Sequence, residues 1–502
     1  MFKLKRNRIV SGLAIGLVFV LILAIALIVR TLNFSPVLTA VSEVPKQHIP
    51  AEAITRLSQA VQIQTISALS DDNLRQQRFQ QFHDFLTRSF PRVSAELSLI
   101  PVNGDALLYR WQGSNASLKP ILLLSHQDVV PVEPGTEQDW QYPPFAGAVA
   151  DGFVWGRGAW DDKSTLMASL EALEMLLKEG EKPTRTLMLA FGHDEEVGGE
   201  QGAAAIAEQF RKQGLEFEFI LDEGAVIGMG LVPGVSQPVA MIATAEKGYL
   251  TLRLTTEGQG GHSSVPPAVT AVGRLAKAVG RLQDEPLPAK LTEPVRDMFE
   301  ALGPHMPWSK RLVLSNLWLF EPLLVSQMAG SRSTQAHVRT TTAPTMLTAG
   351  VKENVLPQTA SAIVNFRILP GQSSQQVIQQ VQDIIADDLV QIEDAGSISS
   401  EPSPISNRNS AAFDALSLAI RQVNPDVLVS PALLFGATDS RHFGGLSANV
   451  FRFTPIRISG KDFSRLHGTN ERIAVADYEN AIRFYFQLIT NTVVNPVSSN
   501  DG

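Results

Sequence analysis

The stretch Ile-Leu-Leu-Leu-Ser-His-Gln-Asp at residues 121–128 joins four apolar residues directly to a histidine and an aspartate. Two later apolar runs, at 187–191 and 217–221, lead in a similar way to His-Asp-Glu-Glu and Asp-Glu-Gly. A short apolar run that ends in such residues is typical of a buried strand in an α/β sheet whose strand ends hold a site. Helical patterns at 164–177 and 201–213 separate these runs. We therefore predict a mainly parallel sheet flanked by helices.

The pattern changes in the middle of the chain. Residues 249–255 alternate as in a strand with one exposed face, and helix and strand patterns follow at 269–282 and 360–368. This order suits a small α+β domain inserted into the first one. Residues 286–350 are rich in proline, and we expect them to be irregular around a very apolar stretch at 312–324.

A chain of 502 residues is too long for one ordinary domain, so two or three are expected. We predict a membrane anchor, a linker, a catalytic domain in two parts, an inserted lid or dimerisation domain and a loose tail. The predicted ranges are 1–30 for the anchor, 31–50 for the linker, 51–247 and 399–491 for the catalytic domain, 248–398 for the inserted domain and 492–502 for the tail.

The N-terminal segment is predicted to be a transmembrane helix. Residues 9–29 form an apolar run that is broken only by Ser11 and two glycines, and such a run is long enough to cross a bilayer core of about 30 Å. Basic residues precede it, which places the N-terminus in the cytoplasm and the body on the periplasmic, lumenal or extracellular side. A cleaved signal peptide is the alternative, although no small-x-small cleavage site follows the run.

Composition excludes some classes of function. The chain has 50 acidic against 42 basic residues, with a formal net charge of −8. This charge repels nucleic acid, and we find no basic patch interleaved with aromatic residues that would reverse it, so no nucleic-acid partner is expected. The absence of cysteine excludes disulfides and thiolate metal sites, but it does not select a redox compartment.

The ligands that a pair of divalent ions requires lie in five short segments, at residues 125–128, 156–163, 193–196, 221–224 and 467–471. Two imidazoles and several carboxylates, without thiolates, suit zinc-like ions. Asp161 is the candidate bridge, because it follows a Gly-Arg-Gly turn and precedes an expected helix. His126 and His467 are the natural imidazole ligands, and Glu196 and Asp222 would complete the two sets. Each segment alone would be an ordinary strand end or solvated loop, but their joint occurrence favours a metal site.

Two further acidic residues have expected roles beside the metals. Asp128, two residues after His126, could orient that imidazole through its second ring nitrogen. Glu195 is adjacent to a ligand but is itself free, so it would be the general base that takes a proton from the attacking water.

Additional motifs support a family resemblance. They are Gly261-His262-Ser263-Ser264, Arg339-Thr340-Thr341-Thr342-Ala343, Asn365-Phe366-Arg367 and Thr438-Asp439-Ser440-Arg441. Over about residues 51–491 the sequence resembles the di-zinc metallopeptidases that include aminoacylase, carboxypeptidase G and carboxypeptidase S. It looks closest to the N-fatty-acyl-amino-acid synthase/hydrolases and carboxypeptidase S. The resemblance implies the metal ligands named above, with Asp161 bridging, and Glu195 as the catalytic acid/base.

The resemblance also implies residues that contact the substrate. His262 matches a histidine that stabilises the oxyanion in related enzymes, where it comes in several cases from the partner subunit of a dimer. It could therefore act in cis or in trans, and a homodimer is one expectation. Asn354 and Arg367 match positions that contact substrate, and Arg441 would clamp a substrate α-carboxylate with its guanidinium. These residues also have purely structural alternatives: Asn354 could form a turn, and the two arginines could form surface ion pairs.

The predicted function is hydrolysis of an amide bond by a zinc-dependent enzyme with two Zn²⁺. The substrate would be an N-acyl amino acid, including one with a long acyl chain, or a short peptide. A carboxypeptidase or dipeptidase acting on peptides is the alternative within this class. An alternative from another class of function is a membrane-tethered binding protein that has lost catalytic activity, although the intact Glu195 argues against this alternative. A serine hydrolase or nucleotide enzyme is disfavoured, because no Gly-x-Ser-x-Gly or phosphate-binding loop occurs.

Overall fold

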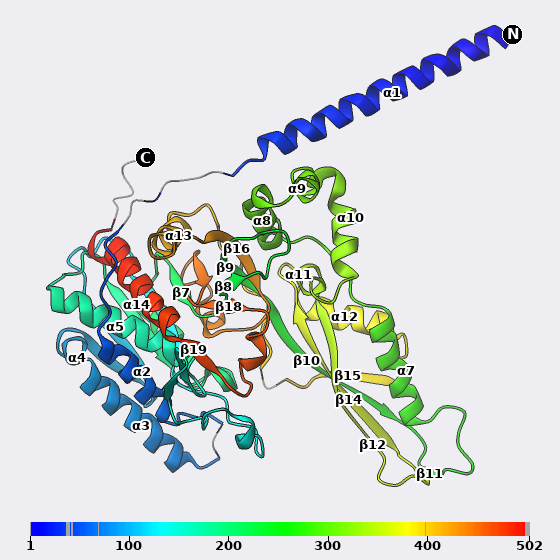
Figure 1. Ribbon diagram of the computed structural model, residues 1–502. Helices are drawn as coiled ribbons and strands as arrows, with labels where there is room; N and C mark the ends of the chain where they lie inside the picture. The colour runs from blue at the N-terminus through cyan, green and yellow to red at the C-terminus, as the bar shows by residue number, and fades with distance from the viewer. Residues whose placement is uncertain (1, 37–40, 42–43, 69, 397, 497–502) are drawn as a thin grey trace.

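A large twisted sheet forms the centre of the protein (Figure 1). The computed structural model describes residues 2–36, 41, 44–68, 70–396 and 398–496. The sheet has ten strands in the order β1-β2-β6-β3-β7-β17-β9-β8-β18, with β16 also paired to β9. Their bounds are β1 Ser98–Val102, β2 Ala106–Trp111, β3 Ile121–His126, β6 Leu187–Gly192, β7 Ile220–Asp222, β8 Ile227–Met229, β9 Val239–Glu246, β16 Leu428–Leu434, β17 Val450–Arg452 and β18 Arg457–Ser459.

The sheet is mixed, so the expectation of a mainly parallel sheet is met in part. Strands β6, β3, β7 and β17 are parallel neighbours, and β9–β16 and β8–β18 are also parallel pairs. By contrast, β1–β2, β2–β6, β17–β9 and β9–β8 are antiparallel. The physical reason at the β1 edge is a tight turn. Asn103 and Gly104 both have positive φ there, and so short a connection can form a hairpin but not a parallel crossover.

Both faces of the central strands are buried. In β2, Leu107 and Tyr109 pack into one hydrophobic cluster, while Leu108 belongs to another on the opposite face. This explains the continuous apolar runs in the sequence, because a strand covered on both faces needs no polar alternation. The covering helices are α2 Ala51–Gln62, α3 Asp72–Ser89, α4 Pro91–Glu96, α5 Lys163–Glu179, α6 Ala203–Lys212, α13 Ala411–Val423 and α14 Val475–Ile489.

A second, antiparallel sheet lies beside the first, at the lower right of Figure 1. Its order is β12-β14-β10-β15, and Leu250, Leu252 and Leu254 point from β10 into a separate hydrophobic cluster under two helices. The elements are β10 Gly248–Glu257, α7 Ala271–Asp284, β12 Thr341–Ala349, β14 Thr359–Ile368, α12 Ser374–Ile385 and β15 Val390–Asp394. We call residues 248–398 the inserted region, and its limits as a domain stay a prediction.

The proline-rich segment at 286–350 is mostly regular, contrary to expectation. It contains α8 Glu293–Leu302, α9 Trp308–Leu314, α10 Leu317–Ala329 and α11 Gln335–Val338, and it ends in β12. Pro294 lies in the first turn of α8, and Pro307 is the residue before α9. Proline at these positions is compatible with a helix start, because the first amide groups of a helix have no partner within the helix.

Smaller elements lie around the two sheets. They are β4 Ala148–Ala150, β5 Phe153–Trp155 and β19 Arg472–Ala474 in one sheet, and β11 Gly261–His262 and β13 Val355–Leu356 in another. The chain also stays packed beyond residue 491, because Thr490–Val494 forms a π-helical turn with Val493 buried. Residues 497–502 of the predicted tail lie outside the described residues.

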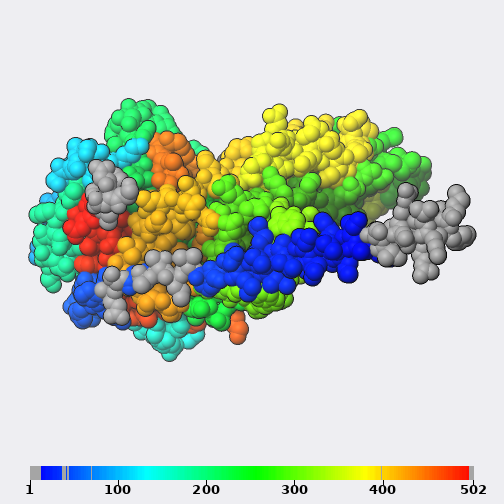
Figure 2. Space-filling model, turned by 90° about the horizontal axis from the view of Figure 1, so that it is seen from above, coloured from blue at the N-terminus to red at the C-terminus, as the bar shows by residue number. Residues whose placement is uncertain are grey.

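The N-terminal helix α1 (Phe2–Asn33) extends away from the body (Figure 1). Viewed from above, it runs out on the side of the inserted region (Figure 2). Its segment Leu13–Asn33 is long and apolar enough to cross a membrane and is a candidate span.

Candidate metal centre

The carboxylate of Asp161 lies between the imidazoles of two histidines. Its Oδ1 is 2.9 Å from Nε2 of His126, and its Oδ2 is 3.0 Å from Nε2 of His467. His126 is the last residue of β3, and Asp161 follows a loop in which Gly158 has a φ of +83°. A Cβ on Gly158 would lie 2.5 Å from Val129 Cγ1, so only glycine allows this loop to approach β3. The sequence prediction of Asp161 as the shared residue fits this geometry.

Two glutamates complete the cluster, one beside each imidazole. Glu196 Oε2 is 3.4 Å from Nε2 of His467, and Glu223 Oε1 is 3.5 Å from Nε2 of His126. His126, Asp161 and Glu196 offer ligand atoms within 4.8 Å of one another, as do His126, Asp162 and Glu223. The described residues therefore form two adjoining ligand sets that have His126 in common.

Glu223, and not Asp222, reaches the cluster. Asp222 is the last residue of β7, and successive side chains of a strand point to opposite sides. Its carboxylate accepts hydrogen bonds from the backbone N–H groups of Ser440 at 2.7 Å and Glu223 at 2.9 Å. In this structure the Asp222 carboxylate therefore holds the neighbouring loop, and its role as a metal ligand stays a prediction. The sequence pattern Asp-Glu-Gly signalled both acids but not which of them faces the site.

Asp128 connects the histidine to the glutamate turn. Nδ1 of His126 lies 3.0 Å from the backbone oxygen of Asp128 and 3.3 Å from its Oδ1. The same carboxylate accepts hydrogen bonds from the backbone N–H groups of Glu195 and Glu196, both at 3.1 Å. Asp128 therefore fixes the imidazole and also sets the position of the two glutamates.

Glu195 lies beside the cluster, and its carboxylate forms no hydrogen bond within the part of the chain that the structure describes. It forms an ion pair with Arg441, whose Nη1 is 3.7 Å from Oε1 of Glu195. Burial raises the pKa of Glu195 well above its usual range; the charge of His126 opposes this shift, and Asp439 adds to it. A carboxylate with a raised pKa is a stronger base, and this suits a group that accepts and returns a proton.

Glu471 joins the loops of Asp161 and His467, and sequence reasoning gave it no role. Its Oε1 accepts hydrogen bonds from the backbone N–H groups of Gly158 at 2.9 Å, Trp160 at 3.0 Å and Asp161 at 3.2 Å. Its Oε2 pairs with the Arg157 guanidinium at 2.5 Å, and Arg157 donates to the backbone oxygen of His467 at 2.9 Å. The only signal in the sequence was an acid four residues after the histidine.

The cluster fits a pair of divalent cations. Every side chain in it offers nitrogen or oxygen donors, as zinc-like ions require. Oε1 of Glu196 and Oδ1 of Asp162 are buried and have no hydrogen-bond partner among the described residues. Burial and the charge of Asp161 raise the pKa of Glu223 to about 7, although His126 opposes the shift. Buried carboxylates so close together require positive charge, which bound ions would supply.

Comparison with known proteins agrees with this geometry. The profile described as Peptidase family M20/M25/M40 matches residues 122–491. The chain belongs to this family. It is 40% identical over 495 residues to "Probable carboxypeptidase S-like 2" of Dictyostelium discoideum, covering 96% of this chain and 93% of that one. It is 41% identical over 446 residues to "N-fatty-acyl-amino acid synthase/hydrolase PM20D1" of Xenopus tropicalis, covering 88% of this chain and 86% of that one.

More distant proteins share the M20 fold. Carboxypeptidase S of Saccharomyces cerevisiae is 32% identical, covering 88% of this chain and 85% of that one. The crystal structure of the M20 family metallo-carboxypeptidase Sso-CP2 from Sulfolobus solfataricus aligns with a TM-score of 0.64, covering 88% of this chain and 99% of that one at 19% identity. The chain is therefore a metal-dependent hydrolase with the α/β fold of the M20 family.

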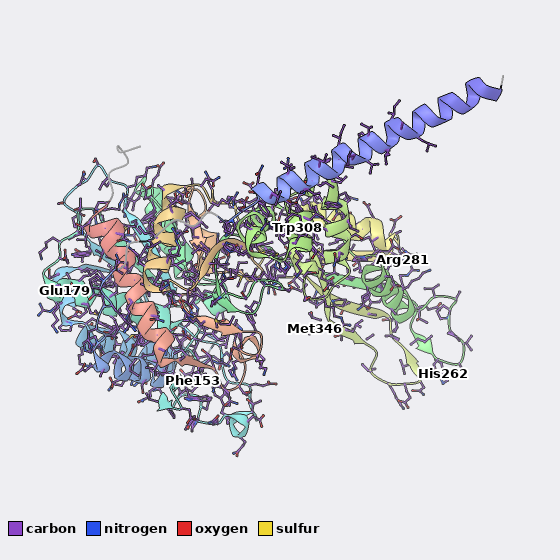
Figure 3. All side chains as sticks on the ribbon, turned by 45° about the horizontal axis from the view of Figure 1, so that its top comes forward. Phe153, Glu179, His262, Arg281, Trp308 and Met346 are labelled. Carbon is purple, nitrogen blue, oxygen red and sulfur yellow. The ribbon has the colours of Figure 1, made fainter. Side chains whose placement is uncertain are left out.

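Of the predicted substrate residues, Arg441 lies beside the M20 metal cluster, whereas His262 and Asn354 lie away from it. Arg441 faces Glu195, and the charge of Arg441 contributes, after burial, to lowering the pKa of Arg367. The guanidinium of Arg367 is 4.4 Å from the ring centroid of Tyr249. By contrast, His262 lies at the outer end of the inserted region, far from the large sheet (Figure 3). Asn354 adjoins it, because its backbone oxygen accepts a hydrogen bond from Ser263.

Proposed function

We propose that this protein is a di-zinc hydrolase that cleaves the amide bond of N-acyl amino acids. The observation that supports this most strongly is the Asp161 carboxylate between His126 and His467, with Glu195 beside it. The ligands of the two ions would be His126 and Glu223 on one side and His467 and Glu196 on the other, with Asp161 shared. A single carboxylate between two imidazoles is the arrangement that a two-metal site requires.

The side chains of the cluster suggest how the reaction proceeds. Bound ions would supply a water of lowered pKa and would polarise the carbonyl of the scissile amide. Glu195 takes a proton from the attacking water and then gives it to the leaving amine as the C–N bond breaks. Asp128 keeps His126 and the Glu195 backbone in place during these transfers. The products are a carboxylic acid and a free amino acid.

The arginines near Glu195 support a substrate with a free α-carboxylate. Arg441 provides a guanidinium group 3.7 Å from Glu195, and Arg367 is the second candidate for this contact. A guanidinium binds a carboxylate through paired hydrogen bonds. An N-acyl amino acid and the C-terminal residue of a peptide both present such a group. The names of the relatives divide in the same way, between N-fatty-acyl-amino acid synthase/hydrolases and carboxypeptidases.

A substrate panel with one substitution tests this function. Purified full-length protein is given long-chain N-acyl amino acids and dipeptides, with and without chelator and added zinc. We expect turnover of the acyl substrates, its loss with chelator and its recovery with zinc. Glu195→Gln should abolish turnover, whereas Glu208→Gln on the surface of α6 is the matched control and should retain it. Turnover of peptides alone would instead make the enzyme a carboxypeptidase or dipeptidase, and chelator-resistant turnover by Glu195→Gln would contradict the mechanism.

We also propose that α1 anchors the protein in a membrane with the body on the non-cytoplasmic side. The apolar segment Leu13–Asn33 supports the span, and the basic residues before it support the orientation. Resistance of the membrane-bound protein to alkaline carbonate, together with protection of the body from protease added on the cytoplasmic side, would agree with this proposal. Release by carbonate would contradict it.

The position of His262 supports an active site that is completed by a residue of a second subunit. It lies at the outer end of the inserted region and not at the cluster of its own chain (Figure 3). We propose that it stabilises the oxyanion in the partner subunit of a homodimer. Mixed dimers of His262→Ala and Glu195→Gln chains should then regain activity, because one site of each dimer would be intact. Persistent inactivity of such mixed dimers would show that His262 acts within its own chain.

A further inference from the structure

Helices α9 and α10 form a bent pair with an unusually exposed apolar surface. Their axes differ by 110°, and we call residues 308–329 the elbow. Trp308 on α9 is 48% exposed, and Trp318 and Leu323 on α10 are 58% and 64% exposed. In α10 only Leu317 and Met328 are buried. Large apolar side chains gathered on one exposed element indicate a surface that meets an apolar partner.

The elbow is joined to the last turns of α1 by buried polar contacts. The Thr31 and Ser315 hydroxyl oxygens are 3.0 Å apart, and Nδ2 of Asn316 donates to the backbone oxygen of Leu27 at 3.3 Å. Thr31 and Asn316 are fully buried. Because these contacts are specific and water-excluded, α1 and the elbow behave as one unit at this point.

Aromatic and basic residues surround this junction. Nε of Arg30 donates to the backbone oxygen of Ser315 at 3.2 Å, and Nε of Arg311 donates to that of Thr31 at 3.2 Å. The Arg311 guanidinium also lies 5.6 Å from the ring of Trp308. Figure 3 shows Trp308 beside the lower end of α1. Tryptophan and arginine at the end of an apolar helix are typical of the layer between the hydrocarbon core and water.

We propose that the elbow lies in the interfacial layer of the same bilayer that α1 crosses, with Trp308, Trp318 and Leu323 inserted among the lipids. This inference rests on the proposed anchor. The contact with α1 identifies the lipid bilayer as the partner of this surface, because the junction places the exposed side chains where α1 leaves the body. The elbow does not span the membrane, since the 13 residues of α10 extend only about 20 Å, against a bilayer core of about 30 Å. The membrane would thus contact the body at a second place.

Quenching of tryptophan fluorescence by brominated lipids tests the proposal. The full chain is reconstituted into phosphatidylcholine vesicles whose acyl chains carry bromine at a shallow position, and flotation confirms its incorporation. The chain has six tryptophans. The four outside the elbow are buried in the protein, namely Trp111, Trp140, Trp155 and Trp160. We expect clear quenching in the wild type and loss of most of it in the double variant Trp308→Phe/Trp318→Phe.

A charged substitution provides an independent result. Leu323→Asp should weaken the quenching of Trp308 and Trp318, because a carboxylate at this site favours water. Leu389→Asp is the matched control, since Leu389 is also 64% exposed in the inserted region but lies outside the elbow, and it should leave quenching unchanged. Vesicles that float with unquenched protein would overturn the inference while the anchor stands. Protein that fails to float would overturn both, and cross-links between elbows of two chains without quenching would show that a second copy covers this surface.

Discussion

Replacement of Glu471 by glutamine tests how the two histidine-bearing loops are held together. In the folded protein the Glu471 carboxylate is fully buried and accepts from three backbone N–H groups and from Arg157. Glu471→Gln keeps the size of the side chain and one acceptor oxygen. It removes the negative charge and turns an N–H₂ group toward Arg157 or toward the backbone amides. Arg157 is itself buried, so its charge would lose its counter-ion.

The size of the effect follows from the burial of this pair. Removing one partner of a buried ion pair costs about 3–5 kcal/mol of folding free energy, because the remaining charge stays without compensation. Residues that hold metal ligands in place typically change metal affinity by about 10–100-fold when they are replaced. We therefore expect Glu471→Gln to lower the free energy of unfolding by roughly 3 kcal/mol. We also expect weaker zinc binding at the Asp161 and His467 loops.

Urea unfolding and zinc titration of the detergent-solubilised full chain measure these two effects. Glu96→Gln is the matched control, because Glu96 pairs with Lys182 at 2.9 Å in an exposed contact at the end of α4. Such an exposed pair contributes at most about 1 kcal/mol, so this variant should resemble the wild type in both assays. If Glu471→Gln unfolds at the wild-type urea concentration and binds zinc equally well, Glu471 does not hold the site together.

Three further changes have expected outcomes. Glu223→Ala should lose one of the two zinc ions by elemental analysis, while Asp222→Asn keeps both; the reverse result would restore Asp222 as the ligand. Arg367→Ala should raise KM for N-acyl amino acids by about 10–100-fold through loss of a charge-assisted hydrogen bond, and Arg253→Ala on the exposed face of β10 should not. Burial raises the pKa of Asp477 from 3.8 to about 6, although the charge of Arg457 opposes this shift. Because the folded form binds the proton more tightly than the unfolded form, the free energy of unfolding falls as the pH rises from about 4 to about 6. Asp477→Asn should remove on the order of 2 kcal/mol of that fall in pH-dependent unfolding, and an unchanged profile would refute the assignment.

The strand ends were predictable because their signal is local. The apolar run before His126 is a buried strand, and the polar residues that follow it lie at the sheet edge where the cluster forms. Which of the two carboxylates, Asp222 or Glu223, faces His126 in the structure was not predictable in this way. A shift of one residue at the end of a strand moves a side chain to the other face, and the bond to Ser440 that fixes this register comes from a distant part of the chain.

Features that depend on contacts between residues far apart in the chain could not be predicted from the sequence. Glu471 acts through backbone amides of a loop more than three hundred residues earlier, and no spacing rule reports such a bond. The elbow was expected to be irregular because of the prolines in segment 286–350, yet Pro307 directly precedes α9 and Pro322 lies inside α10. In the structure, Trp318 and Leu323 of this apolar stretch are exposed. Composition gave the hydrophobicity of this stretch but not its surroundings.

Anomalous X-ray scattering at the zinc edge, from crystals of the protein grown with zinc, tests the central claim most directly. The account predicts two peaks on opposite sides of the Asp161 carboxylate, one next to His126 and Glu223 and the other next to His467 and Glu196. A single peak, or a peak coordinated by Asp222 in place of Glu223, would contradict the proposed two-metal site.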